Sequence, residues 1–488
     1  MYALLMACTA APGTPPKDSA PIPTPAGPVV LAGGGSEGDN GDPDSWSARL
    51  YKSLLEGGDV TGDGKLRVAV LSVEEEDDWL PRYWEELGAD EAFNLQVATR
   101  ADASDPTLEA ELADVDAAFL KGGDQGEYYD RWNDSELEAG LLALRERGGG
   151  LGGTSAGAMS MAGYTFAGGE DLISADVLAD AQTPYLDDAT DGGSGIHSDF
   201  LGVVPGVVID THFSARGRLG RLAGILARVV EEEAPARLLG LGLDERTGLV
   251  LRGAEAEVIG EGAVTVLDPS SAGPAQRPAG RPLHWSGLGL HRLTEGFRLD
   301  LDDGHIEAPA EAEAVAWDGR SGSTEGEWLA DGDRLSHEER FAVVVQAEPY
   351  SSHAGTDLPV LADAVGVLDA HRSDRRYGAS EALFRVLYDH VGYSGFLVGE
   401  GGSLERLREG EAQVAAVDNP ESGAPAMAGL VVDSSGLSLR ALALLPSGAG
   451  DGSLQTAALV GLRLHVLYSP VGGQVYNTVT RSVEAPEP

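Results

Sequence analysis

The amino-acid sequence predicts an α/β fold with a mostly parallel sheet flanked by helices, followed by a β-rich or α+β C-terminal domain. In the first half of the chain, short apolar runs rich in β-branched residues alternate with segments of helical spacing, which is the order of a parallel sheet. A stretch rich in Pro, Gly and Ala at residues 272–282 ends this alternation, and short strands with Gly- and Asp-rich turns follow. We therefore expect a tether at 1–27, an α/β domain at 28–270 and an accessory region at 283–488.

The predicted elements follow one another along the chain. The apolar runs predict strands at residues 28–32, 66–72, 95–98, 117–120, 207–210 and 239–243, and a strand-rich stretch at 258–266. In the second half they predict a strand at 341–346 and further strands within 457–469. Helical spacing predicts helices at residues 46–56, 79–87, 135–147 and 380–387. Because the carboxyl ends of parallel strands gather at one edge of a sheet, the polar loops after these strands are the expected place of a functional site.

Composition limits the classes of partner. A chain of 488 residues exceeds one ordinary core, so two or three domains are expected. The net charge is −45, with 79 acidic and 34 basic residues, which argues against nucleic acid as a partner because phosphate binding needs a basic face. We interpret the acidic surface first as a solvated coat that keeps the protein soluble, and second as a field that attracts cationic substrates.

The N-terminus carries a possible lipidation signal. Cys8 is the one cysteine, so no intrachain disulfide can form. The residues from Leu4 to Cys8 resemble the lipobox of a bacterial lipoprotein signal, and residues 9–28 have the Pro, Ala, Thr and Gly content of a flexible tether. We therefore expect a bacterial protein that is exported and is either lipid-anchored at the cell envelope through Cys8 or extracellular, with no other membrane contact.

A Gly-x-Ser-x-Gly pentad at residues 153–157 is the most informative motif. Such a pentad takes the chain through a tight strand-to-helix turn and exposes the serine hydroxyl at the start of the helix. The glycines permit strained dihedral angles and leave room beside the substrate. Ser155 is therefore a candidate nucleophile.

A second polar block follows the predicted strand at 207–210. This strand delivers Asp210 and His212 to its end. Three arginines follow within six residues: Arg216, Arg218 and Arg221. Because the arginine fork binds carboxylates in a bidentate manner, the cluster suggests an acidic group in the substrate, with a surface ion-pair network as the alternative. The predicted strand at 239–243 likewise ends in acidic residues.

Four separated blocks resemble cyanophycinase: Gly122–Gln125, Gly153–Ala158, Asp210–Arg221 and Gly242–Thr247. That family consists of serine peptidases related to α-aspartyl dipeptidase, with a class I glutamine-amidotransferase-like fold. The resemblance covers about residues 29–268. It implies that the 28–270 domain is catalytic and cuts cyanophycin (multi-L-arginyl-poly-L-aspartate) into β-aspartyl-arginine dipeptides. It implies neither a metal nor another cofactor, and no His, Cys or Asp spacing here is typical of a metal site.

The resemblance assigns a catalytic triad. It implies that Ser155 is the nucleophile, His212 the general base and Glu245 the acid that orients the imidazole. A serine hydroxyl needs such a base, and the base needs a partner that fixes its tautomer. The order Ser, His, Glu differs from that of α/β-hydrolases, which argues against an esterase or lipase of that fold. Asp210 and Glu170 remain competing candidates for the orienting acid.

The resemblance also assigns the surroundings of the triad. The oxyanion hole is expected at backbone N–H groups of Gly123, Asp124 and Ala156. The residues expected to bind substrate are Gln125, Asp210, Thr211, Arg216, Arg218 and Arg221. Thr211 stands where the family usually has glutamine, so a substrate contact would be lost there. The long stretch at 167–202 is expected to form a lid or rim over the pocket, with a plain surface insertion as the alternative.

The expected partner is a peptide or a cyanophycin-like polymer, and a homodimer is among the possible assemblies. Two other functions stay open. One is an aspartyl or β-aspartyl dipeptidase of the same superfamily, and the other is a catalytically silent surface binding protein that keeps the fold.

Overall fold

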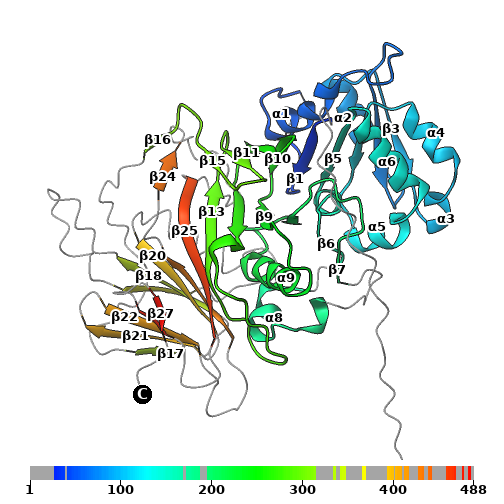
Figure 1. Cartoon of the computed structure of the whole chain (residues 1–488). Coiled ribbons are helices and arrows are strands. Elements are labelled where there is room, and N and C mark those ends of the chain that lie inside the picture. Colours follow the sequence, from blue (N-terminus) through cyan, green and yellow to red (C-terminus); the bar gives the residue numbers. More distant parts are fainter. Residues whose placement is uncertain are drawn as a thin grey trace, which may run out of the picture.

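The computed structural model describes residues 27–38, 41–168, 172–186 and 195–314, followed by separate strand segments up to residue 484 (Figure 1). Those segments are 334–336, 341–347, 365–369, 393–399, 402–408, 411–416, 427–433, 438–441, 458–468, 475–477 and 482–484. Cys8, almost all of the predicted tether and the predicted helix at 380–387 lie outside the described residues.

The first sheet has nine strands in the order β15-β14-β11-β10-β1-β5-β4-β2-β3. Five strands pair in parallel: β1 (Val29–Ala32), β5 (Gly150–Thr154), β4 (Ala117–Leu120), β2 (Arg67–Ser72) and β3 (Glu91–Gln96). The others pair antiparallel along one side: β10 (Thr247–Arg252), β11 (Glu255–Gly260), β14 (Arg298–Asp300) and β15 (Ile306–Glu307). The predicted α/β fold with its mostly parallel sheet is confirmed.

Helices cover both faces of this sheet (Figure 1). The helices are α1 (Trp46–Lys52), α2 (Trp79–Leu87), α3 (Arg100–Ala103), α4 (Thr107–Ala113), α5 (Gln125–Trp132) and α6 (Glu136–Glu146). Successive strand residues point to opposite faces. Val30 and Phe119 accordingly share a buried cluster with side chains of α1 and α2. Leu31 and Leu120 belong to the other cluster, together with side chains of α4 and α6.

The second sheet joins the two halves of the chain. Its main path runs β19-β18-β20-β23-β25-β13-β12-β9-β8. The five strands at one end of this path are β25 (Ala458–Leu467), β13 (Trp285–Leu293), β12 (Val264–Asp268), β9 (Leu239–Leu243) and β8 (Val207–Asp210). β8 and β9 are parallel, and the pairs β9–β12, β12–β13 and β13–β25 are antiparallel. The sheet therefore continues without a break across the predicted linker at 272–282.

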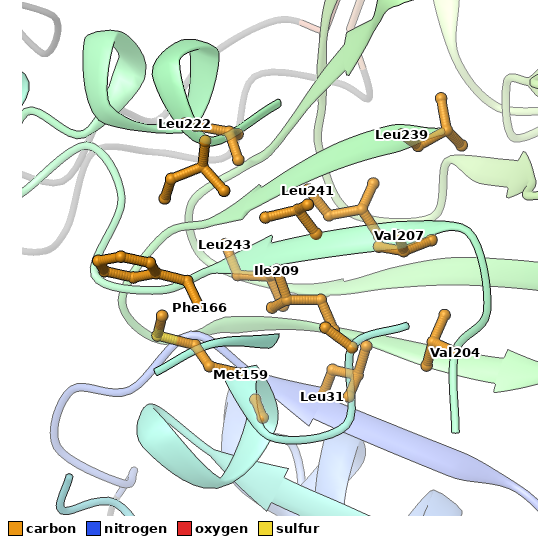
Figure 2. Close-up of a cluster of buried hydrophobic side chains, with 14 of the residues drawn as sticks. Leu31, Met159, Phe166, Val204, Val207, Ile209, Leu222, Leu239, Leu241 and Leu243 are labelled. Atoms are coloured by element: carbon orange, nitrogen blue, oxygen red, sulfur yellow. The ribbon is translucent and has the colours of Figure 1, made fainter. Parts of the chain in front are cut away.

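The helix α9 (Leu219–Glu232) packs on β8 and β9, and α8 (Ser174–Ala179) packs on α9. Figure 2 shows the apolar cluster here, with Leu222 of α9 on one side of β9 and with Leu31 and Met159 on the other side of β8. This cluster joins β8 and β9 to β1, so the loops that follow these strands are held next to one another.

After residue 272, every element of the described segments is a strand. The strands not yet named are β16 (Glu313–Ala314), β17 (Arg334–Ser336), β18 (Phe341–Ala347), β19 (Val365–Asp369), β20 (Tyr393–Gly399), β21 (Gly402–Arg408), β22 (Glu411–Ala416), β23 (Gly429–Asp433), β24 (Ser438–Ala441), β26 (Val475–Asn477) and β27 (Ser482–Glu484). The β-rich alternative for this half is therefore confirmed for the described residues.

Some element boundaries differ from the prediction. The third strand, expected at 95–98, lies at Glu91–Gln96, because it is a half-exposed edge strand with polar residues and no apolar run. The stretch 457–469 forms one long strand, Ala458–Leu467. The helices α3, α4 and α5 were not predicted, since α3 and α4 are short and α5 is rich in polar residues. Within the described residues, no helix combines the length and apolar character needed to cross a membrane.

Candidate active site

The serine lies in a strained turn between β5 and α7 (Ala156–Met159). Ser155 has φ 52° and ψ −120°, dihedral angles that a side-chain-bearing residue rarely adopts. A Cβ atom on Gly153 would lie 2.5 Å from the carbonyl carbon of Gly157, and one on Gly157 would lie 2.2 Å from the oxygen of Leu120. The two glycines of the pentad are therefore required for α7 to pack directly on β5 and the end of β4.

His212 faces this serine. Its Nε2 lies 2.9 Å from Ser155 Oγ. β8 ends at Asp210, and His212 has φ 47°, so the chain leaves the strand geometry before it reaches the histidine. The backbone N–H of His212 donates to the carbonyl of Gly33 at 2.9 Å, which fixes the turn against the end of β1.

Glu245 completes the constellation from the loop between β9 and β10. Its Oε1 lies 2.8 Å from His212 Nδ1. A carboxylate accepts hydrogen bonds only, so Nδ1 carries the proton and donates to Glu245. Nε2 is then free to accept the Ser155 hydroxyl proton, which is the arrangement of a nucleophile, a base and an orienting acid.

The charges in the site favour a neutral imidazole. Burial lowers the pKa of His212, the hydrogen bond to Glu245 opposes that shift, and the charges of Arg216 and Arg218 add to the lowering. The hydrogen bond from His212 lowers the pKa of Glu245, against the effect of partial burial. At neutral pH the histidine can therefore take a proton while the glutamate stays ionised, as general-base catalysis requires.

The glycine turn after β1, residues 33–35, positions two of the site's side chains, a role that was not predicted from the sequence. Gly34 has φ +89°, and a Cβ there would lie 2.4 Å from His212 Cε1. The backbone N–H of Arg246 donates to the Gly34 carbonyl at 2.8 Å, so the same turn also holds the loop that carries Glu245. Three consecutive glycines directly after a predicted strand were the available signal, but no role was inferred from them.

The loop after β4 lies on the other side of the serine. A Cβ on Gly122 would be 3.3 Å from Ser155 Cβ. The Tyr128 hydroxyl lies 3.0 Å from the carbonyl oxygens of both Lys121 and Gly122 and holds the loop in place. Of the predicted oxyanion-hole residues, Gly123 follows directly in this loop with φ +148°, Asp124 caps α5 by accepting from Gly126 N at 2.7 Å, and Ala156 begins α7, where an N–H has no intrahelical acceptor.

The prediction that Asp210, Arg218 and Arg221 bind substrate is wrong. Asp210 is fully buried and Arg221 is 2% exposed. Arg221 donates to Asp210 from Nε at 2.9 Å and from Nη2 at 2.6 Å, and Arg218 Nη1 donates to it at 3.1 Å. Burial opposes ionisation, but the two arginines hold the pKa of Asp210 below its usual value. These side chains are thus paired with one another inside the protein. For the same reason Asp210 is not the orienting acid.

Thr211 is also misassigned as a substrate contact, because it is 1% exposed and its Oγ1 is buried without a hydrogen-bond partner among the described residues. Arg216 and Gln125 are half-buried and remain candidates. The Gln125 side chain donates from Nε2 to the Gly168 carbonyl at 2.8 Å, at the start of the stretch predicted to form a lid. Glu170 lies outside the described residues.

The described parts of the 167–202 stretch are attached to α5. β6 (Thr165–Phe166) pairs with β7 (Ile196–His197), and the short helix η2 (Pro184–Leu186) lies between α8 and β7 in sequence. The ring of His197 stacks on Tyr129 with centroids 3.6 Å apart, and the Tyr129 hydroxyl donates to Asp199 at 3.3 Å. Among the described residues, no group of three His, Cys, Asp or Glu could hold a metal ion.

Comparison with known proteins shows the lineage. A cyanophycinase of Nostoc sp. is 33% identical over 226 residues, which cover 45% of this chain and 68% of that protein. A cyanophycinase of Geminocystis herdmanii is 32% identical over 220 residues, 44% of this chain and 73% of that protein. A solved peptidase from an acI-B1 actinobacterium aligns with 56% of this chain and 97% of its own, at 21% identity and a TM-score of 0.36. A search against protein-family models gave no match. The chain belongs to the cyanophycinase family of peptidases.

Proposed function

We propose that this protein is a serine peptidase that hydrolyses cyanophycin to β-aspartyl-arginine dipeptides. The observation that carries the proposal is the continuous hydrogen-bonded chain from Ser155 Oγ through His212 to Glu245, at 2.9 and 2.8 Å. The strained backbone of Ser155 supports it, because such strain is found where a nucleophile is held ready.

The reaction follows from these contacts. Ser155 Oγ attacks the carbonyl carbon of the scissile peptide bond while His212 Nε2 takes the hydroxyl proton, and Glu245 stabilises the imidazolium. The backbone N–H groups of Gly123 and Ala156 donate to the oxyanion of the tetrahedral intermediate. His212 then protonates the leaving amine and an acyl-enzyme remains. A water molecule, deprotonated by His212, hydrolyses that ester and releases Ser155.

The charge distribution suits a substrate that carries both signs. The net charge of −45 attracts a polymer rich in arginine side chains and speeds its encounter. Arg216, which is half-buried and close enough to act on the pKa of both His212 and Glu245, is the arginine available for a substrate carboxylate.

The test is incubation of the purified protein with cyanophycin, with mass spectrometry for β-aspartyl-arginine. We expect the dipeptide from the wild type and none from Ser155→Ala. Cleavage of short Asp-X or β-Asp-X peptides without cyanophycin breakdown would instead assign a dipeptidase of the same superfamily. Failure of a fluorophosphonate probe to label Ser155 in the folded wild type would contradict both enzymatic functions and leave a binding protein.

We further propose that the protein is exported and held at the cell envelope by a lipid on Cys8. The lipobox-like residues Leu4–Cys8 and the tether-like composition that follows support this. Replacement of Cys8 by serine in the full-length protein should move it from the membrane fraction to the soluble fraction. Unchanged fractionation would contradict the anchor.

A further inference from the structure

Arg292 is a fully buried charge on β13, outside the domain predicted to be catalytic. Its exposed fraction is 0%. A guanidinium in such a place is costly unless it is paired and hydrogen-bonded. Arg292 Nη2 donates to Asp244 Oδ2 at 2.7 Å, and its Nη1 donates to Ser214 Oγ at 2.9 Å. The charge is thus paired with Asp244, and Nη1 also lies 3.5 Å from Thr265 Oγ1.

Ser214 and Asp244 belong to the two loops that carry the base and its orienting acid. Ser214 lies two residues after His212, and Asp244 immediately precedes Glu245. The loops are also joined directly, because the Ser214 backbone N–H donates to Asp244 Oδ1 at 2.9 Å.

Arg292 and the residue that precedes β12 both donate hydrogen bonds to the Asp244 carboxylate. The Asp244 carboxylate accepts from Arg292 and, at 3.1 Å, from the backbone N–H of Ala263, just before β12. Asp244 is itself only 6% exposed, and Ser214 is 6% exposed. Without Arg292, a buried carboxylate would lose its counter-charge at the point where the two catalytic loops meet.

We propose that Arg292 is a positioning residue of the active site, which acts through Asp244 and Ser214 to hold Glu245 at hydrogen-bonding distance from His212. The catalytic unit therefore includes β13 and cannot end near residue 270. This inference rests on the proposed peptidase function.

A merely structural role predicts a different outcome from a positioning role. If Arg292 only stabilises the fold, its loss lowers the unfolding temperature but leaves turnover per intact site unchanged. If it positions the triad, turnover falls in the folded fraction. The acidic limb of the pH–rate profile also moves, since Glu245 raises the pKa of His212 while burial, Arg216 and Arg218 lower it. A loosened Glu245 contact shifts that limb to lower pH.

The experiment compares Arg292→Gln and Arg292→Lys with wild type in the full chain. Arg298→Gln is the matched control, because Arg298 is an arginine of the next strand whose side chain is 46% exposed. Folded active sites are counted by fluorophosphonate titration, and kcat and KM for cyanophycin are referred to that count. We expect kcat of Arg292→Gln to fall about 10- to 100-fold, the effect of displacing a catalytic group by roughly 1 Å. KM should change little, Arg292→Lys should recover part of the loss, and Arg298→Gln should match wild type.

Unchanged kcat per titrated site and an unmoved acidic limb in Arg292→Gln would overturn the proposal, whatever happens to its unfolding temperature. If Arg292→Gln does not fold, Ser214→Ala decides, because it removes one Arg292 contact and retains the charge pair. It should lower kcat several-fold, and unchanged kcat would refute the proposal.

A wild type without cyanophycinase activity would contradict the proposed function and leave the positioning role to be judged separately. The low-field proton NMR signal of His212 Nδ1 serves for that. It should weaken or shift in Arg292→Gln relative to wild type and Arg298→Gln, and an identical signal in all three would refute the positioning role.

Discussion

Two clusters of polar side chains start at the end of β8 and differ in almost every other respect. Asp210, the last residue of the strand, is fully buried and satisfied by Arg218 and Arg221. Two residues later, His212 turns the other way and contacts Ser155 and Glu245, whose side chain is 43% exposed. We call the first set the buried ion cluster and the second the triad. Each set contains one carboxylate, which is fully buried in the buried ion cluster and partly exposed in the triad.

The two sets differ in how many hydrogen bonds their polar groups already make within the protein. The Asp210 carboxylate accepts three hydrogen bonds from two arginines, so it has little to offer a ligand. In the triad, one hydrogen bond at each ring nitrogen orients the imidazole and leaves its proton transferable. The positive φ of His212 makes the change of direction between these neighbours possible.

The largest expected difference follows from Ser155→Ala. The variant should lose about 10⁴-fold or more in kcat/KM, because the nucleophile acts with its base as one unit. Its free energy of unfolding should stay within about 0.5 kcal/mol of wild type, since only a partly exposed hydroxyl is removed. Steady-state kinetics and urea unfolding test the two halves of this prediction. Retained activity would mean that another residue is the nucleophile.

Asp210→Asn should lower the free energy of unfolding strongly, in contrast to Ser155→Ala. Removing one charge of a buried ion pair leaves buried arginine charges uncompensated, which costs about 3–5 kcal/mol of stability. The matched control is Asp63→Asn, which breaks a more exposed Asp–Arg pair at 2.6 Å to Arg67 and should change the urea midpoint little. Equal midpoints for the two variants would show that the buried ion cluster does not stabilise the fold as inferred.

Gly34→Ala tests how closely the triad is packed. A methyl group there would meet the His212 ring at 2.4 Å, so the imidazole must move and activity should fall about 10²-fold. Gly41→Ala is the control, because Gly41 also has a positive φ, +102°, but a methyl group there meets nothing within 4 Å. The two variants share the backbone strain, so a difference between them reports the contact with His212. Similar activities would contradict the inference that Gly34 packs against the His212 ring.

The smallest effect is expected in the pH dependence. Burial lowers the pKa of His212, so the acidic limb of kcat/KM, which reports protonation of the free enzyme's base, should lie below pH 6.5. The Glu245 hydrogen bond raises that pKa, so Glu245→Gln should move the limb further down while it lowers kcat. A limb that moves up in Glu245→Gln would show that the carboxylate does not contact the base in the active protein.

A residue's role could be predicted from the sequence where a local motif indicates it, and not where it depends on contacts with distant parts of the chain. Ser155, His212 and Glu245 could be proposed because they stand in three of the sequence blocks that resemble cyanophycinase, and that resemblance implies their roles. Ser155 follows β5 of the first sheet, whereas His212 and Glu245 follow β8 and β9 of the second sheet, so packing between the two sheets brings them together. Arg221 was misassigned because an arginine in sequence does not reveal whether its counter-ion is a ligand or a buried aspartate. Gly34 and Arg292 were missed because their contacts are with residues far away in the chain.

The sequence alone was sufficient for the alternation of strands and helices and for the strained serine turn. These depend on local apolar periodicity and on glycine's conformational freedom, whereas the roles of Ser155, His212 and Glu245 were inferred from the family resemblance. Only the tertiary structure decided which polar side chains face the interior and which face the site. Burial is set by packing between distant segments: α9 covers β8 and encloses Asp210, while β13 from the second half supplies the charge that joins the loops of His212 and Glu245.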